Sequence, residues 1–128
     1  MDNPAVLDSS AILAVVFNEP GSDIALPLLQ DALLSAVSLA EIHARLLLDG
    51  VPSDFAWERI LNLGCEVCLF DGEQARIAGD LAGKTRPFGL SLGGRACLAL
   101  AIQRHATVYT TDRAWKSLAL PIDIEVIR

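Results

Sequence analysis

The chain has 128 residues, of which 52% are hydrophobic, and its mean hydropathy is +0.42. That length and composition suit one compact domain with a well-buried core, so a single domain over residues 1–128 is expected. The formal net charge of −6 argues against a protein that holds nucleic-acid phosphates on a basic surface, because such binding depends on lysine and arginine displacing counterions. Any phosphate chemistry here needs a cation, which a cluster of carboxylates would recruit.

The sequence also limits the cellular setting. Apolar runs at residues 32–39 and 92–102 are interrupted by polar residues well before the ~20 residues that a membrane span needs. The opening Met-Asp-Asn-Pro leads straight into a strand-like run, without the basic region and cleavage site of a signal peptide, so a cytoplasmic location is expected. Cys65 and Cys68 have the CxxC spacing, but they lie in a strand-like run with no second pair, which favours small apolar residues over a zinc or redox site.

Strand-like and helical segments alternate along the whole chain. In chain order, the patterns predict a strand at 5–7, helices at 11–17 and 22–31, a strand at 33–37, helices at 38–50 and 54–63, a strand at 65–70, a helix at 71–81, a loop at 83–89, a helix at 91–105, a strand at 107–110, a short helix at 113–116 and a strand at 124–127. Strands that alternate with helices form parallel sheets covered on both faces. The expected fold is therefore a three-layer α/β/α domain with a mostly parallel five-stranded sheet.

Three acidic residues lie just beyond predicted strands. Asp8 follows the first strand directly, Glu41 lies in the first turn of the helix after the second, and Asp112 follows the fourth directly. In open parallel α/β sheets the functional groups collect beyond the carboxyl ends of the strands, so these acids are expected to meet at one edge. Two carboxylates about 5 Å apart repel by roughly 3 kcal/mol at an effective dielectric near 20, so such a cluster requires a cation or raised pKa values.

Each acid also has a purely structural interpretation. Ser38 and Glu41 have the spacing of a capping box, in which a serine and a glutamate satisfy the amides at a helix start. Asp8 and Asp112 can equally cap the helices that follow them. Asp71 begins a similar capping spacing and is interpreted as structural, because it lies outside the segments 6–10, 38–41, 90–101 and 108–113, whose order and spacing form a motif.

Four segments occur together in a recognisable order and spacing. They cover residues 6–10, 38–41, 90–101 and 108–113, and the third reads Leu-Ser-Leu-Gly-Gly-Arg-Ala-Cys-Leu-Ala-Leu-Ala. With these segments the sequence resembles PIN-domain ribonucleases of the VapC toxin type across essentially its whole length. The family's usual run has an aspartate where Gly94 stands, so the resemblance implies both a nuclease and the loss of one carboxylate from its site.

The resemblance implies a metal-dependent endoribonuclease toxin of a type II toxin–antitoxin pair. It implies that Mg²⁺ or Mn²⁺ is held by Asp8 and Asp112, that Glu41 contributes directly or through water, and that Ser10 or Thr111 hydrogen-bonds a ligand or water. Such ions prefer oxygen ligands, generate hydroxide from bound water and stabilise charge on an attacked phosphodiester. The implied partners are an RNA substrate, a second copy in a homodimer, and a cognate antitoxin whose C-terminal segment wraps the toxin and occludes the acidic groove.

Basic and histidine side chains add less to this hypothesis. Four basic residues are candidate phosphate contacts, although a solvated surface charge is the favoured interpretation of each: Arg86, Arg95, Arg113 and Lys116. His43 lies two positions from Glu41 and so faces another side of the helix. His105 lies at a helix C-terminus, where the helix dipole favours a charged imidazole, so neither histidine requires a catalytic role.

Two other functions compete with the nuclease. A non-catalytic PIN-domain variant would keep the antitoxin-binding surface and act in a complex that represses its own operon, and Gly94 is the residue that separates this alternative from an active enzyme. A receiver-like signalling domain also has five strands and an aspartate cluster. It needs adjacent acids after the first strand, a phospho-acceptor aspartate ending the third and a lysine after the last long strand. This chain offers Asp8-Ser9, Asp71 and Asp112 instead, which disfavours the receiver.

Overall fold

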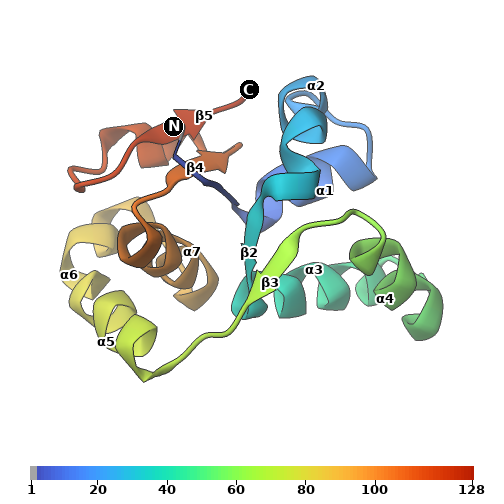
Figure 1. The fold of residues 1–128 in the computed structure, drawn as a ribbon, viewed down its shortest axis with the longest axis horizontal. Helices are drawn as coiled ribbons and strands as arrows, with labels where there is room; N and C mark the ends of the chain where they lie inside the picture. The colour runs from blue at the N-terminus through green and yellow to red at the C-terminus, as the bar shows by residue number, and fades with distance from the viewer. Residues whose placement is uncertain (1–2) are drawn as a thin grey trace.

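The structure, a computed structural model, describes residues 3–128 as strands that alternate with helices (Figure 1). The elements are β1 Ala5–Leu7, α1 Ser9–Val16, α2 Ser22–Ala25, the 3₁₀ helix η1 Leu26–Asp31, β2 Leu33–Ser35, α3 Ala36–Leu48, α4 Ser53–Leu61, β3 Glu66–Cys68, α5 Gly72–Asp80, α6 Ala82–Thr85, η2 Arg86–Phe88, α7 Leu92–Arg104, β4 Thr107–Thr110, η3 Arg113–Ser117 and β5 Ile124–Val126.

One sheet runs through the described part of the chain. Its five strands lie in the order β3-β2-β1-β4-β5, and every pairing between neighbours is parallel. Ala5 lies opposite Thr107 and Leu7 opposite Tyr109, so β1 and β4 are adjacent and end at the same edge. The predicted fold class is confirmed. This order differs from the 2-1-3-4-5 order of receiver domains, which removes that alternative.

Helices cover both faces of the sheet, as Figure 1 shows with α5–α7 on one side and α1–α4 on the other. Neighbouring strand residues point to opposite faces, so Leu7 packs with the α1–α4 core while Val6 packs with the α7 core. The helix α7 is buried over its whole middle, from Ala96 to Ala101, because it packs against the sheet, α5 and α3. Among residues 3–128, no helix has the length and apolar character that crossing a membrane requires.

The start of α3 differs from the prediction. Ser35 caps this helix, since its hydroxyl accepts a hydrogen bond from the Val37 backbone N–H at 3.2 Å. The strand β2 therefore ends at Ser35, and α3 begins before Ser38. The capping-box interpretation of Ser38 and Glu41 is wrong, because Ser38 lies inside the helix and is fully buried. Glu41 is consequently free of a capping role at the start of its own helix.

Two further segments also differ from their predictions. The helix expected over residues 22–31 is a turn of α-helix followed by a 3₁₀ helix, because Pro27 at the start of η1 has no backbone N–H to continue the α-helical hydrogen bonds. The segment expected as a loop at 83–89 contains α6 and η2 instead. The Thr85 hydroxyl donates to the Leu81 carbonyl at 2.9 Å within that segment, and Gly89 ends it with φ of 72°.

The exposed face of α5 gives a test of the helical assignment. Gly79 lies in this helix, and a Cβ added there would meet no atom within 4 Å. Replacing Gly79 with alanine lowers the backbone entropy of the unfolded chain at no steric cost, so we expect Gly79→Ala to raise the free energy of unfolding by about 0.5–1 kcal/mol. Urea denaturation measures this change. An unchanged or lower value would contradict a helix at this position.

Candidate functional site

A cavity of about 160 Å³ lies at the carboxyl edge of the sheet, where β1, β2 and β4 end. The residues that line it are Asp8, Ser9, Glu41, Gly89, Leu90, Ser91, Gly94, Asp112 and Trp115. The three acids singled out from the sequence therefore line the same cavity as position 94. They come from segments far apart in the chain, and parallel pairing of adjacent strands brings those segments to one edge.

Asp8 is the most buried of the three acids, with 6% of its surface exposed. It occupies the N-cap position of α1, yet its side chain makes no capping hydrogen bond. Its Oδ2 instead accepts hydrogen bonds from the hydroxyls of Ser10 at 2.7 Å and Thr110 at 3.0 Å. Burial raises the pKa of Asp8 above its ordinary value of 3.8, and these two hydroxyls act in the opposite direction.

Thr110 is a residue of this site that the sequence analysis missed. It ends β4, is fully buried, and binds both Asp8 and the backbone N–H of Asp112, which donates to its Oγ1 at 3.1 Å. The alternation of side chains along the strand could have indicated Thr110. It shares a strand face with buried Val108 and so places a hydroxyl where an apolar side chain is usual. Ser10 accepts from the Thr111 backbone N–H at 3.1 Å, which completes the link between the ends of β1 and β4.

Glu41 reaches the cavity from α3 and is more exposed than Asp8. Its carboxylate lies directly against Gly93 on α7, so a Cβ built on Gly93 would overlap that carboxylate. Burial raises the pKa of Glu41, and the nearby charge of Asp8 raises it further, while a hydrogen bond to the Ser9 side chain lowers it. Asp8 and Glu41 therefore interact as two like charges across the cavity.

Asp112 is exposed and has a defined structural contact. Its Oδ1 accepts a hydrogen bond from the Ala114 backbone N–H at 3.0 Å, so it caps η3 as the structural interpretation proposed. Asp71 likewise caps α5 through the Gln74 backbone N–H at 2.9 Å, and it does not line the cavity. Asp112 lines the cavity while it caps η3, so both interpretations of this residue fit its position.

The carboxylate oxygens of these acids are ligands that suit a hard divalent cation, but they do not make a complete set of metal ligands. Within residues 3–128, no group of three or more His, Cys, Asp or Glu side chains is arranged to hold a metal ion. Position 94 lies in the first turn of α7, which has no acidic residue. As the chain stands, its residues do not form a full ligand set.

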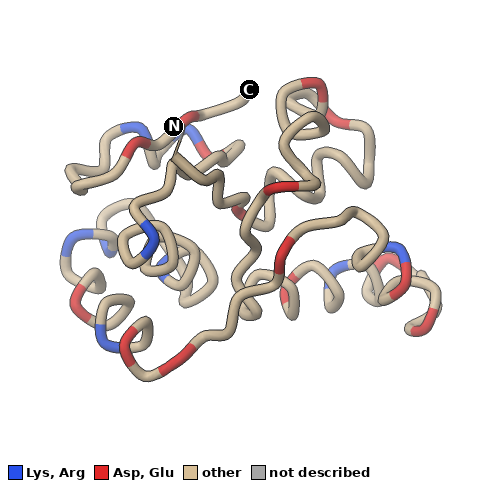
Figure 2. Tube along the Cα trace, viewed as in Figure 1, with Lys and Arg blue, Asp and Glu red and all other residues tan. Residues whose placement is uncertain are grey.

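The basic and histidine candidates take structural roles or lie on the surface. Arg95 donates to the Ala78 carbonyl at 3.2 Å, and Arg113 donates to the Arg128 carbonyl at 3.1 Å. His43 contacts Ser53 and the edge of Trp57, and so ties α3 to α4. Three other candidates are exposed, and none of them lines the cavity: Arg86, Lys116 and His105. Acidic and basic residues are interspersed over the outer helices (Figure 2).

The buried charge of Asp8 gives a stability prediction. Because its pKa is raised in the folded protein, the folded state binds a proton more tightly than the unfolded state, and stability falls as pH rises from 3.8 through the folded-state pKa. Asparagine keeps an oxygen for Ser10 and Thr110 but carries no charge. We expect Asp8→Asn to raise the free energy of unfolding at pH 7 in the absence of divalent ions, by on the order of 1 kcal/mol.

The gain should shrink as the pH is lowered toward 3.8, where the parent carboxyl is protonated as well. Asp54→Asn in the exposed first turn of α4 is the matched control, and it should give no such pH-dependent gain. Chemical denaturation at a series of pH values measures both variants. A loss of stability in Asp8→Asn at pH 7 would show that the charged carboxylate is favourable where it lies.

The chain matches a known family profile, and its fold is similar to those of solved structures. The PIN domain family profile matches residues 5–120. FitAcB from Neisseria gonorrhoeae is 23% identical, with a TM-score of 0.69 over 94% of this chain and 95% of that one. VapBC2 from Rickettsia felis, bound to a DNA fragment from its promoter, is 18% identical, with a TM-score of 0.71 over 94% and 96%. VapBC-5 from Mycobacterium tuberculosis is 22% identical, with a TM-score of 0.63 over 98% of both chains.

At these identities, the solved structures establish a shared fold. No curated protein sequence gives a significant match. The family profile spans all the strands except β5 and every segment that lines the cavity. The chain therefore belongs to the PIN domain family.

Proposed function

We propose that this chain is the toxin of a VapC-type toxin–antitoxin pair, and that its cavity is an endoribonuclease site weakened by Gly94. The observation that carries the proposal is the shared cavity, in which Asp8, Glu41 and Asp112 line the same space as Gly94, the position where the resemblance calls for a fourth acid. PIN domains are generally nucleases, and several solved structures of similar fold are toxin–antitoxin complexes. RNA is the proposed substrate.

Mg²⁺ or Mn²⁺ is the cofactor that this donor set would take. A carboxylate at position 94 would add to Asp8, Glu41 and Asp112, and the bound ion would supply hydroxide and neutralise charge on the phosphodiester. The chain's own residues hold the Asp8 carboxylate in place through Ser10 and Thr110 before any ion arrives. Without the fourth acid, weak ion binding and little or no cleavage are expected.

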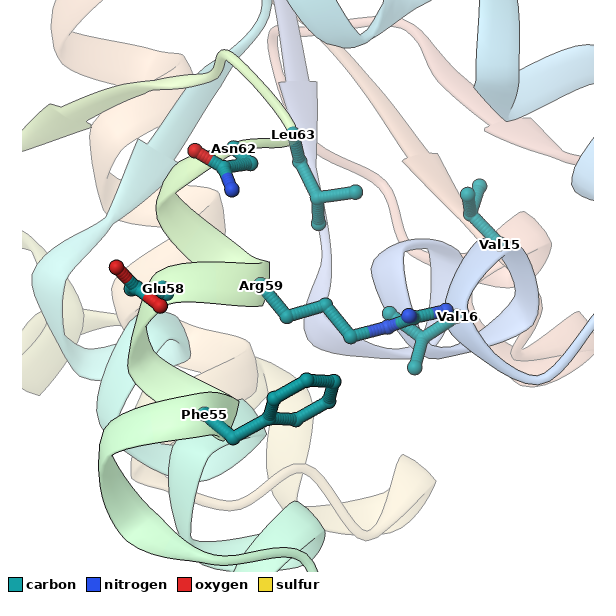
Figure 3. A pocket seen from close by; sticks show the side chains of 7 residues that line it. All are labelled: Val15, Val16, Phe55, Glu58, Arg59, Asn62 and Leu63. Carbon is teal, nitrogen blue, oxygen red and sulfur yellow. The ribbon is translucent and has the colours of Figure 1, made fainter.

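A groove and an adjoining apolar hollow on the surface support the proposal of a protein partner. A groove of about 360 Å³ between α1 and α4 is lined by Val15, Val16, Phe55, Glu58, Arg59, Asn62 and Leu63 (Figure 3). A second, apolar hollow of about 210 Å³ continues from it and shares Val16, Phe55 and Arg59. Phe55 is 59% exposed, and large apolar surfaces of this kind mark protein contacts. We assign this groove to the cognate antitoxin; the homodimer implied by the resemblance is part of the same proposal.

Gly94 favours a second candidate function. A PIN-domain variant without nuclease activity would bind the antitoxin through the same groove and take part in repressing its own operon. The incomplete ligand set supports this alternative as directly as it supports a weakened enzyme. The two candidates differ in whether any RNA cleavage depends on the remaining acids.

An RNA cleavage assay with Mn²⁺ separates the two candidates. We expect little cleavage by the chain as it stands and a gain of roughly tenfold or more in Gly94→Asp, because the added carboxylate strengthens ion binding beside Asp8 and Glu41. Adding Asp8→Asn to Gly94→Asp should remove that gain.

The outcomes of this assay have distinct meanings. Full activity of the unmodified chain that Asp8→Asn abolishes would show that position 94 is not essential. No cleavage by either protein, together with antitoxin binding, would favour the non-catalytic function.

The groove is tested by co-expressing the chain with its cognate antitoxin. Phe55 lines both hollows, and burying an aspartate there without a partner is unfavourable, so we expect Phe55→Asp to weaken the complex by about tenfold or more. Leu69→Asp is the matched control, because Leu69 is 80% exposed and lies outside the groove. Calorimetric titration of purified partners gives the two affinities. Equal affinities for both variants would show that the antitoxin binds outside this groove.

A further inference from the structure

Charge is unevenly distributed along this chain, although its net value is −6. Residues 81–122 contain six lysines and arginines and a single acid, Asp112, so this segment has a formal charge of +5. The rest of the chain contains four basic and fifteen acidic residues and so carries −11. The positive segment forms α6, η2, α7, β4 and η3, and it supplies six of the nine residues that line the acidic cavity.

Four cations of this segment lie close in sequence to the cavity lining. Lys84 in α6 and Arg86 in η2 come directly before residues 89–91, which line the cavity. Arg113 and Lys116 lie in η3, which also supplies a residue of the lining. All four are exposed. In Figure 2, lysines and arginines are frequent on the side of the fold that holds α6 and α7.

The two segments that carry these cations approach each other at the cavity. An ideal Cβ on Gly94 would lie 3.2 Å from Leu90, which follows η2, and 3.1 Å from Trp115 in η3. The backbone that carries one pair of cations and the backbone that carries the other therefore lie on two sides of position 94. A ligand that reaches the cavity would pass between them.

The four cations are available to a ligand. The ion pairs within residues 3–128 join Arg45 to Asp49 and Arg128 to Glu19, so they involve none of the four. At physiological ionic strength, charges are screened over about 8 Å. A ligand at the cavity therefore responds to these nearby cations more strongly than to the acids on the far side of the molecule.

We infer that four exposed cations form a phosphate-binding face, which holds the backbone of a single-stranded RNA as it enters the acidic cavity: Lys84, Arg86, Arg113 and Lys116. Lysine and arginine contacts to phosphates position a strand without reading its sequence. An unpaired strand suits this site because Asp8 is only 6% exposed, and a flexible backbone enters a recess more easily than a duplex does. The choice of RNA rests on the proposed function, whereas the binding of a phosphodiester backbone rests on the charges.

Fluorescence anisotropy with a labelled single-stranded RNA of mixed sequence tests this face. The titration is done in EDTA, so binding is measured without metal-dependent cleavage. We expect Arg86→Gln/Lys116→Gln to bind the RNA about tenfold more weakly at low salt. The slope of log affinity against log salt concentration should become shallower by about 1.4, because each single-strand phosphate contact contributes about 0.7.

Arg45→Gln/Arg59→Gln is the matched control, because it removes the same charge from α3 and α4, outside the positive segment. Its RNA affinity and salt slope should stay close to those of the unmodified chain. Equal weakening in the two double variants would show that RNA responds to net charge alone. That result would overturn the inference, as would unchanged binding in Arg86→Gln/Lys116→Gln or no measurable RNA binding by the unmodified chain at low salt.

Duplex DNA and the purified antitoxin are the other ligands to titrate. If Arg86→Gln/Lys116→Gln weakens binding of either one while RNA binding is unchanged, the face serves that ligand and the inference is overturned.

The inference and the proposed function fail in different ways. If RNA binding depends on these cations as expected but Gly94→Asp gives no cleavage with Mn²⁺, the nuclease proposal fails and the phosphate-binding face stands. If Gly94→Asp cleaves RNA but Arg86→Gln/Lys116→Gln leaves RNA binding unchanged, the inference fails and the nuclease proposal stands.

Discussion

The burial of the Asp8 carboxylate at the carboxyl edge of a parallel sheet is the constraint around which this site is built. Adjacent parallel strands β1 and β4 end together, and the hydroxyls of Ser10 and Thr110 hold Asp8 between them. Burial of a charge without a cation is unfavourable, as the raised pKa of Asp8 reflects. The fold thus holds an acid whose charged form is disfavoured by burial, and a bound cation would favour that charged form.

Gly94 lines the acidic cavity without contributing an acid of its own. Where a carboxylate would face the cavity, Trp115 and Leu90 pack against the bare helix backbone. Apolar contact replaces like-charge repulsion there, which favours the folded state in the absence of an ion. An acid at position 94 would add like-charge repulsion to the cavity in the absence of an ion, and on the proposed function it would also add to ion binding.

The acidic cavity and the groove between α1 and α4 have different chemistry. The cavity at the sheet edge carries the acids, whereas the groove between α1 and α4 combines apolar walls with Arg59 and Glu58. The two sites share no lining residue, so the partner proposed for the groove would bind without contacting the residues that line the acidic cavity. On the proposed function, this separation would allow the chain to bind an antitoxin whether or not position 94 carries an acid.

The sequence by itself determined the alternation of strands and helices, the parallel sheet and the three acids beyond the strand ends, because hydrophobic periodicity and residue type are local properties. It misplaced the start of α3 and missed Thr110, since Ser35 and Ser38 are equally good caps by type, and the partner of a buried hydroxyl lies across the sheet. Only the tertiary structure decided that Leu90 and Trp115 lie beside Gly94 at the cavity. Packing between segments distant in sequence depends on three-dimensional proximity, which no local pattern encodes.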